Sequence, residues 1–255
     1  MRLLTFNTLM RNRAADRLRA LAGELERSDF DIVCLQEVMW RSHYRLLRRL
    51  SPSYRYGACS GTALLRGGLV LLSRWPIVEH SFHRYPITGP VRPELLMRKG
   101  AQVATVAIAD ARLTVINTHL SANPTDDWSN ESPYTRVQAV ELTCLARLVA
   151  SVAAETPVVV AGDLNVPRSS TGFAALLAHA GLQDTMAGYA GPTYRPTAGW
   201  PNPPALDHVL VRTPRDRAVE ATAQLVFERP VQLAGGRETY LSDHFGVAVR
   251  LTWRG

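Results

Sequence analysis

The sequence lacks the features that mark several specialised classes of protein. It has three cysteines, Cys34, Cys59 and Cys144, an odd number spread along the chain. This indicates reduced, structural thiols and argues against a disulfide framework or a cysteine zinc site. No apolar run reaches the length of a membrane-spanning helix. The apolar stretch after Met1 is too short for a signal peptide, which predicts a cytoplasmic protein.

The sequence also lacks a dense basic block, although its net charge is +7. A basic chain favours a polyanionic partner such as nucleic acid, a phospholipid surface or a phosphorylated metabolite, but scattered charge identifies none of them. Lysine is almost missing, because Lys99 is the single lysine of the chain. Lysine is a compact point charge and arginine a planar fork. Lys99 therefore either occupies a place that only a point charge suits or stands there by chance.

What the sequence does contain is an alternation of strand and helix patterns without a linker, which predicts one domain over residues 1–255. Apolar runs predict strands at 2–8, 31–37, 68–73, from Val158, and at 205–211, 218–227 and 244–253, with a hairpin over 101–120. Helical spacing, cap residues and a stopping glycine predict helices at 14–27, 132–152 and 173–180. Three long segments rich in proline, glycine and polar residues are predicted functional loops, at 85–98, 121–133 and 187–204.

Polar side chains stand where apolar strands end or begin. They are Asn7, Glu37, His119, Asp163, Asn165, Asp207, Asp243 and His244. Each residue alone is better explained as a turn, a solvated group or a satisfied core residue. Together they place ionisable groups beside apolar runs, where burial is costly unless the groups are paired or bind a metal. Carboxylates and amides suit a hard cation such as Mg²⁺, and two histidines suit proton transfer near neutral pH.

The polar pattern occurs twice along the chain. In the first half Asn7 follows the opening strand, and "NTHL" (117–120) closes the series. In the second half "GDLN" (162–165) opens the series and "SDHF" (242–245) closes it. Two similar halves that each supply an asparagine, an acid and a histidine suggest two facing sheets with one site between their ends.

In their order along the chain, these motifs resemble those of the endonuclease/exonuclease/phosphatase superfamily. The resemblance covers residues 7 to 244 and rests on Asn7, "QE" (36–37), "NTHL", "GDLN", "LDHVLV" (206–211) and "SDH" (242–244). It implies a four-layer α/β/β/α sandwich of two mixed, mostly antiparallel sheets flanked by helices. It also implies hydrolysis of phosphoester bonds that depends on Mg²⁺, with Mn²⁺ as a substitute.

The resemblance implies a role for each metal and proton-transfer residue. Glu37 is expected to be the main Mg²⁺ ligand, with Asn7 beside it, and Asp243 is expected to bond the metal shell through water. His244 is expected to act as the base or to orient the attacking water. Asp207 is expected to pair with His244 and fix its tautomer.

The remaining roles concern water and the phosphoryl group. Asp163 is expected to orient the water or to hold a second metal, and Asn165 and His119 to donate to phosphoryl oxygens. Within the superfamily, "RKGAQVATV" (98–106) is similar to a Lys-Gly segment of the neutral sphingomyelinase branch, as are "INTHLSAN", "TRVQAVEL" and "YLSDHFGV". This places Lys99 near the phosphate. It favours a phosphodiester with a small or lipid-linked head group, hydrolysed by in-line water attack by a monomeric enzyme.

Other functions stay open at this point. The long loops show no apolar wedge for membrane contact, so a phosphatase of a phosphorylated metabolite is an alternative. A nuclease is less favoured because no basic and aromatic recognition segment stands out, and the intact polar set argues against a non-catalytic phosphate-binding relative. His208, next to Asp207 on a strand, is predicted to point the opposite way. Aromatic residues of the loops either line a substrate cleft or pack the loops: Trp128, Tyr134, Tyr189, Tyr194 and Trp200.

Overall fold

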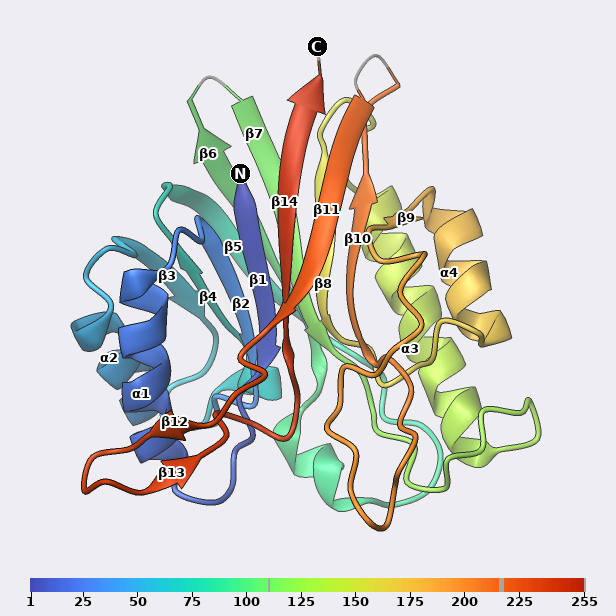
Figure 1. The fold of residues 1–255 in the computed structure, drawn as a ribbon. Helices are drawn as coiled ribbons and strands as arrows, with labels where there is room; N and C mark the ends of the chain where they lie inside the picture. Colours follow the sequence, from blue (N-terminus) through green and yellow to red (C-terminus); the bar gives the residue numbers. More distant parts are fainter. Residues whose placement is uncertain (110, 216–217, 255) are drawn as a thin grey trace.

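Two six-stranded sheets lie face to face at the centre of the computed structural model, which describes residues 1–109, 111–215 and 218–254 (Figure 1). The first sheet contains, in order, β11 (Ala218–Val226), β14 (Gly246–Arg254), β1 (Arg2–Asn7), β2 (Ile32–Gln36), β4 (Val70–Ser73) and β3 (Tyr56–Cys59). The second contains β5 (Ile77–Arg84), β6 (Gly100–Ile108), β7 (Ala111–His119), β8 (Val158–Asp163), β10 (Asp207–Arg212) and β9 (Gln183–Asp184). A separate ribbon pairs β12 (Val231–Gln232) with β13 (Glu238–Thr239).

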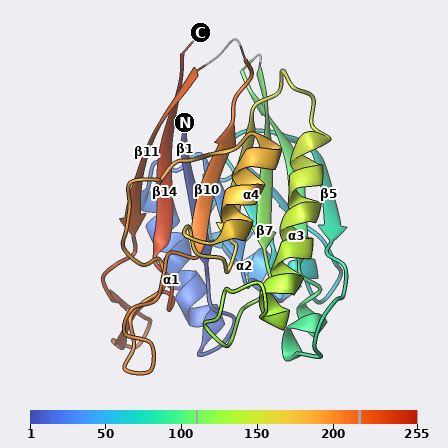
Figure 2. The same cartoon turned by 90° about the vertical axis from the view of Figure 1, so that its right-hand side faces the viewer.

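Helices cover the outer face of each sheet. In Figure 1, α1 (Ala14–Arg27) and α2 (Arg41–Leu50) lie on one side and α3 (Pro133–Ala150) and α4 (Thr171–Ala180) on the other, and Figure 2 shows α3 and α4 side by side. Two short 3₁₀ helices, η1 (Arg66–Gly68) and η2 (Pro93–Met97), lie in connections. The predicted four-layer α/β/β/α sandwich is confirmed. Among the described residues, no helix has the length and apolar character that crossing a membrane requires.

Three apolar layers hold these four layers together, because the strands are buried on both faces. Alternate residues of one strand enter different layers. Leu3 packs between the two sheets with Val159, whereas Leu4 packs under α1 with Leu21. On the far side of the second sheet, Val160 packs under α3 and α4 in the third cluster. Continuous apolar runs in the sequence therefore correspond to strands at the centre of the sandwich.

Each sheet contains one parallel pair near its centre, and the other paired strands are antiparallel. The parallel pairs are β1 with β2 and β7 with β8. A helix makes the crossover in each pair, α1 in the first and α3 in the second, as parallel strands require. The carboxyl ends of both pairs lie at the same edge of the sandwich, the lower edge in Figure 1. The two similar halves seen in the sequence do not coincide with these two pairs. "NTHL" of the first half ends β7, next to "GDLN" of the second half on β8, and "SDHF" precedes β14 in the first sheet.

The predicted elements are found with shifted ends, and some elements were not predicted. The helix predicted over 132–152 ends at Ala150, and η2 lies inside the segment predicted as the loop 85–98. Asp110, in the turn of the predicted hairpin, lies outside the described residues. The prediction missed α2, whose fully buried apolar residue is Leu47, and β5, an edge strand with mostly exposed side chains. These elements bury too little apolar surface to give a periodic signal.

Candidate active site

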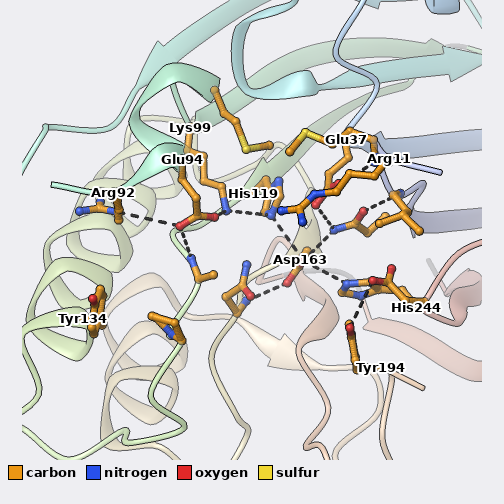
Figure 3. A pocket seen from close by; sticks show the side chains of 18 of the residues that line it. Arg11, Glu37, Arg92, Glu94, Lys99, His119, Tyr134, Asp163, Tyr194 and His244 are labelled. Carbon is orange, nitrogen blue, oxygen red and sulfur yellow. Dashed lines mark hydrogen bonds and ion pairs between the residues drawn. The ribbon is translucent and has the colours of Figure 1, made fainter. Parts of the chain in front are cut away.

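A cavity of about 700 Å³ opens at the edge where the two parallel pairs end (Figure 3). Its lining includes eight of the nine predicted site residues: Asn7, Glu37, Lys99, His119, Asp163, Asn165, Asp243 and His244. The ninth, Asp207, is fully buried directly behind His244. Because these residues come from both halves of the chain, the structure brings together what the sequence places far apart.

Asn7 joins the ends of the two sheets. Its side-chain Nδ2 donates to Glu37 Oε1 at 3.2 Å and to Asp163 Oδ2 at 3.0 Å, although Asp163 lies 156 residues away in the chain. Glu37 has a φ of 61°, in the left-handed region, so β2 stops there and the carboxylate turns into the cavity. Its other oxygen accepts from the Met10 backbone N–H at 2.8 Å. One amide thus lies between two carboxylates.

The stretch "VVVAGDLNVP" (158–167) shows how the second sheet places the carboxylate of Asp163 in the cavity. Gly162 lies so close to β7 that a Cβ there would be 1.9 Å from the Thr118 carbonyl oxygen, so only glycine fits. Asp163 then ends the strand with its carboxylate in the cavity, where Oδ1 accepts from the Asn165 backbone N–H at 3.0 Å. Burial, and next the charge of Asp207, raises the pKa of Asp163 to about 7.

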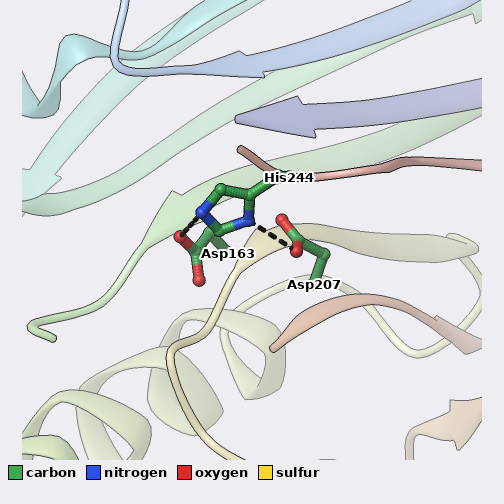
Figure 4. A group of neighbouring side chains, drawn as sticks. All are labelled: Asp163, Asp207 and His244. Carbon is green, nitrogen blue, oxygen red and sulfur yellow. Dashed lines mark hydrogen bonds and ion pairs between the residues drawn. The ribbon is translucent and has the colours of Figure 1, made fainter. Parts of the chain in front are cut away.

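His244 and Asp207 form a buried pair beside Asp163 (Figure 4). His244 Nδ1 lies 2.9 Å from Asp207 Oδ2, and Nε2 lies 3.8 Å from Asp163 Oδ2. Burial alone would lower the pKa of His244, but the charges of Asp207, Asp163 and Asp243 outweigh it and raise the pKa to about 10. Asp207 is aligned because β10 pairs antiparallel with β8 and places it opposite Asp163. The pair therefore keeps Nε2 turned toward the cavity.

His119 and Lys99 lie on the other side of Asp163. His119 Nε2 lies 3.5 Å from Asp163 Oδ2 and 3.0 Å from Lys99 Nζ. Burial, with the charges of Lys99 and His244, lowers the pKa of His119 well below its usual range. Lys99 also donates to the Leu120 carbonyl at 2.8 Å and forms an ion pair with Glu94. The ammonium of the single lysine is therefore in the wall of the cavity, but it already has a carboxylate partner.

Asn165 and Asp243 complete the lining. Asn165 has a φ of 52°, and its Nδ2 donates to the Leu120 carbonyl at 2.9 Å, so one of its two amide hydrogens is already used. Asp243 Oδ2 accepts from the Tyr194 hydroxyl at 3.2 Å. Burial and the charge of Asp243 raise the pKa of Tyr194 to about 12, which keeps the hydroxyl protonated as a donor.

The aromatic residues of the loops lie in different places, and only some of them line the cavity. Tyr134 and Tyr194 line the cavity (Figure 3), whereas Trp128 donates to the Asn165 carbonyl from outside it. Tyr189 donates to a carbonyl of its own loop, and Trp200 packs on Tyr194 with ring centroids 5.3 Å apart. As predicted, His208 points away from Asp207. It is fully buried, lies 2.8 Å from the Val166 carbonyl and stacks on Phe173.

Sequence reasoning missed four residues that shape the site. Glu94, Arg92 and Arg11 line the cavity, and nothing in their spacing marks them, because Arg11 lies in a loop and the other two lie in or next to the short helix η2. The fourth, Arg17, is a buried arginine on α1. Its guanidinium donates to the carbonyls of Thr8, Leu9, Arg11, Asn12 and Leu241. An arginine on the apolar face of an amphipathic helix was the signal that could have found it.

The donor set fits a divalent cation. Glu37, Asn7 and Asp163 place two carboxylates and an amide around one point. Such oxygen-rich sets suit Mg²⁺. Asp163, Asp207 and His244 also have ligand atoms within 4.8 Å of one another and form a second candidate metal cluster. Because Asp207 already holds Nδ1 of His244, this cluster serves better as a hydrogen-bonded relay.

Three comparisons place the chain among known proteins. Inositol phosphosphingolipids phospholipase C of Schizosaccharomyces pombe is 30% identical over 178 residues, which cover 65% of this chain and 41% of the relative. Human sphingomyelin phosphodiesterase 2 is 28% identical over 178 residues, covering 67% of this chain and 41% of the relative. The chain thus spans about two fifths of the length of these relatives. Both names agree with the predicted sphingomyelinase-like branch.

Solved structures extend the likeness to the whole fold. A Staphylococcus aureus beta toxin mutant with bound magnesium ions superposes with a TM-score of 0.79 over 97% of this chain and 98% of its own, at 19% identity. Residues 4–244 match the model of the Endonuclease/Exonuclease/phosphatase family. With the sandwich fold in agreement, this match shows that the chain belongs to the endonuclease/exonuclease/phosphatase family.

Proposed function

We propose that this protein is a Mg²⁺-dependent phosphodiesterase of the sphingomyelinase-like type. The observation that carries the proposal is the position of Asp163. Its carboxylate lies within 3.0 Å of Asn7, 3.5 Å of His119 and 3.8 Å of His244, at the floor of an open cavity. A water, a phosphoryl group and a cation can all be held around this one carboxylate.

The side chains divide the work of phosphoester hydrolysis. When bound at Glu37 and Asn7, Mg²⁺ would supply the positive charge that neutralises phosphoryl oxygens. Asp163 Oδ2 and His244 Nε2, 3.8 Å apart, both face the cavity and are placed to bind the attacking water together. His244, with its pKa of about 10, is protonated and orients the water as a donor, so Asp163 accepts the proton. The Asp207 bond to Nδ1 keeps His244 in the orientation that this requires.

The donors on the far side of Asp163 complete the arrangement. The free amide hydrogen of Asn165 is placed to donate to the phosphoryl oxygens, where charge increases in the transition state. His119, whose Nε2 accepts from the Lys99 ammonium, holds Lys99 beside this place. Lys99 adds a positive charge from the cavity wall, where its ion pair with Glu94 holds it. Two findings support a lipid-linked or small-molecule phosphodiester as the substrate: the relatives' names are those of lipid phosphodiesterases, and the cavity is open to the surface.

The first test compares bis-p-nitrophenyl phosphate with p-nitrophenyl phosphate, each with Mg²⁺, with Mn²⁺ and with chelator. We expect turnover of the diester that chelator abolishes and Mg²⁺ restores. His244→Ala and Glu37→Gln should each lower kcat at least about 100-fold, since general acid–base and metal contributions are of this size. His179→Ala, which changes an exposed histidine on α4, is the matched control and should keep the normal rate.

The other outcomes separate the alternatives. Turnover of the monoester alone would make the protein a phosphatase. Hydrolysis of neither compound, together with phosphate binding that does not need Mg²⁺, would indicate a non-catalytic relative. An unchanged rate in the folded His244→Ala protein would contradict the role given to His244.

A further inference from the structure

A second cavity, of about 580 Å³, adjoins the first beside the β12–β13 ribbon. The two cavities share Leu9, Asn12 and Asp243 in their lining. The second cavity therefore lies next to a phosphoryl group held at Asp163, on the side of Asp243. This geometry makes the second cavity the natural place for one side of a bound phosphodiester.

The charge of this lining is strongly positive. Four arginines line it against one carboxylate, Asp243: they are Arg13, Arg17, Arg195 and Arg237. Two of the four are fixed in place, because Arg17 and Arg195 donate to backbone carbonyls of the surrounding loops. Arg13 pairs with Asp16 at 2.8 Å. Among the described residues, the Arg237 side chain has no hydrogen-bond or ion-pair partner, so its guanidinium is available to a ligand.

The aromatic rings of Tyr240 and Phe245 already make cation–π contacts with Arg195. The Arg195 guanidinium lies 3.9 Å from the ring centroid of Tyr240 and 4.3 Å from that of Phe245. A quaternary ammonium needs such ring faces, or carboxylates, to replace its water. Here the rings stack on Arg195, and the surrounding arginines would repel a second cation. The cavity therefore disfavours a choline head group.

We propose that the second cavity binds a second anionic group, a phosphate or carboxylate, next to the phosphodiester that is cleaved. This inference rests on the proposed function, because the first cavity must hold the scissile phosphate. Arg237 is the specificity-determining residue, since its planar guanidinium can bind two oxygens of such an anion. The favoured substrate is then a phosphodiester whose head group carries an extra negative charge.

The test measures binding and turnover separately. Calorimetry in the presence of Mg²⁺ compares 1,3-propanediol bisphosphate, 3-hydroxypropyl phosphate and phosphocholine. We expect the bisphosphate to bind at least about tenfold more tightly than 3-hydroxypropyl phosphate, and phosphocholine to bind most weakly, since a bidentate charge-assisted contact exceeds 1.4 kcal/mol. Arg237→Gln should reduce the ratio of bisphosphate to monophosphate affinity to about one. Arg229→Gln, which removes an equal charge from an exposed arginine outside the lining, should keep the ratio.

Each remaining result has a defined meaning. Equal or tighter binding of phosphocholine, or an unchanged ratio in Arg237→Gln, would overturn the proposal. Competition of the bisphosphate with bis-p-nitrophenyl phosphate supports an anion carried by the substrate itself. Inorganic phosphate that binds through Arg237 without competing supports a separate anionic molecule in the same cavity. Failure of the phosphodiesterase proposal would appear as absent turnover, whereas failure of this inference would appear in the calorimetry alone.

Discussion

At the scale of single residues, Arg17 connects parts of the site that are distant in the chain. It holds the carbonyls of the segment after β1, and that segment in turn donates a backbone N–H from Met10 to Glu37. The same guanidinium holds the carbonyl of Leu241, 224 residues away, just before Asp243 and His244. Burial lowers the pKa of Arg17, with the charges of Asp243 and Glu37 acting against it. Arg17 is thus placed to position both Glu37, the proposed metal ligand, and His244, the proposed catalytic histidine.

Arg17→Lys keeps the charge but cannot reach five carbonyls, because an ammonium has three donors. We expect a loss of about 3 kcal/mol in the free energy of unfolding, the size typical of broken buried charged hydrogen bonds. We also expect kcat to fall at least about tenfold and the Mg²⁺ affinity to weaken, because Glu37 loses its aligned loop. Urea unfolding, kinetics and Mg²⁺ titration measure the three effects.

The control for this variant is Arg212→Lys. Arg212 also donates to several carbonyls, those of Val149, Val152, Ala153 and Thr156 at the end of α3, far from the site. It should lose comparable stability while kcat and Mg²⁺ affinity stay normal. If both variants changed kcat equally, the effect of Arg17 would be stability alone.

At the scale of elements, the segment 85–98 differs from what the sequence analysis predicted. Its composition predicts a polar loop without an apolar wedge, but Ile87 is 59%, Val91 94% and Leu96 78% exposed. Val91 lines the mouth of the active-site cavity, and the exposed Arg84 and Arg98 flank the segment. Proline and glycine in the sequence hid these separate aliphatic side chains, because they show no periodicity. Aliphatic side chains beside positive charge suit contact with an anionic lipid surface.

This segment predicts a difference between soluble and membrane substrates. Ile87→Ser with Leu96→Ser should lower hydrolysis of a phosphodiester lipid in anionic vesicles by roughly tenfold or more, because each side chain loses apolar burial of about 1.5–3 kcal/mol. Turnover of bis-p-nitrophenyl phosphate should be unchanged, since neither side chain lines the active-site cavity. Val78→Ser, which changes a 48% exposed aliphatic residue on β5, is the control and should have no effect in vesicles. Equal losses with both substrates would contradict a membrane contact.

The same scale shows which parts of the fold were predictable. Strands such as β8 were found because burial on both faces makes them continuous apolar runs. The helix α2 was not predicted, because its sequence is rich in arginine and only one of its leucines, Leu47, is fully buried. The nine site residues could be named from motifs at strand ends. Their contacts could not, since the Asn7–Asp163 bond and the Glu94–Lys99 pair depend on how the sheets meet.

At the scale of the whole molecule, stability should depend on pH through His208. Burial, and next the charge of Arg168, lowers its pKa from 6.5 to about 3 in the folded protein. Below pH 6.5 the unfolded chain therefore takes up a proton that the folded protein does not. Stability is lost as pH falls from 6.5 toward 3, by about 2 kcal/mol at pH 5 for this one group.

The comparison of urea unfolding at pH 7.5 and pH 5 tests this prediction. His208→Asn should be less stable than the natural protein at pH 7.5, yet its difference between the two pH values should be smaller by about 2 kcal/mol. His179→Asn, at an exposed position, should keep the natural pH difference. An equal pH difference in all three proteins would show that His208 is protonated in the folded state.

The contact between the ends of the two parallel pairs has a consequence for how the protein folds. Each pair closes early through its own crossover helix, because the residues that it joins are near in sequence. Asn7 and Asp163, 156 residues apart, meet only when the two finished sheets dock. A collapsed intermediate can hold both sheets and most of its secondary structure and still have no catalytic centre. We therefore expect activity to appear only after the two sheets dock, which measurements of secondary structure and compactness alone would not detect.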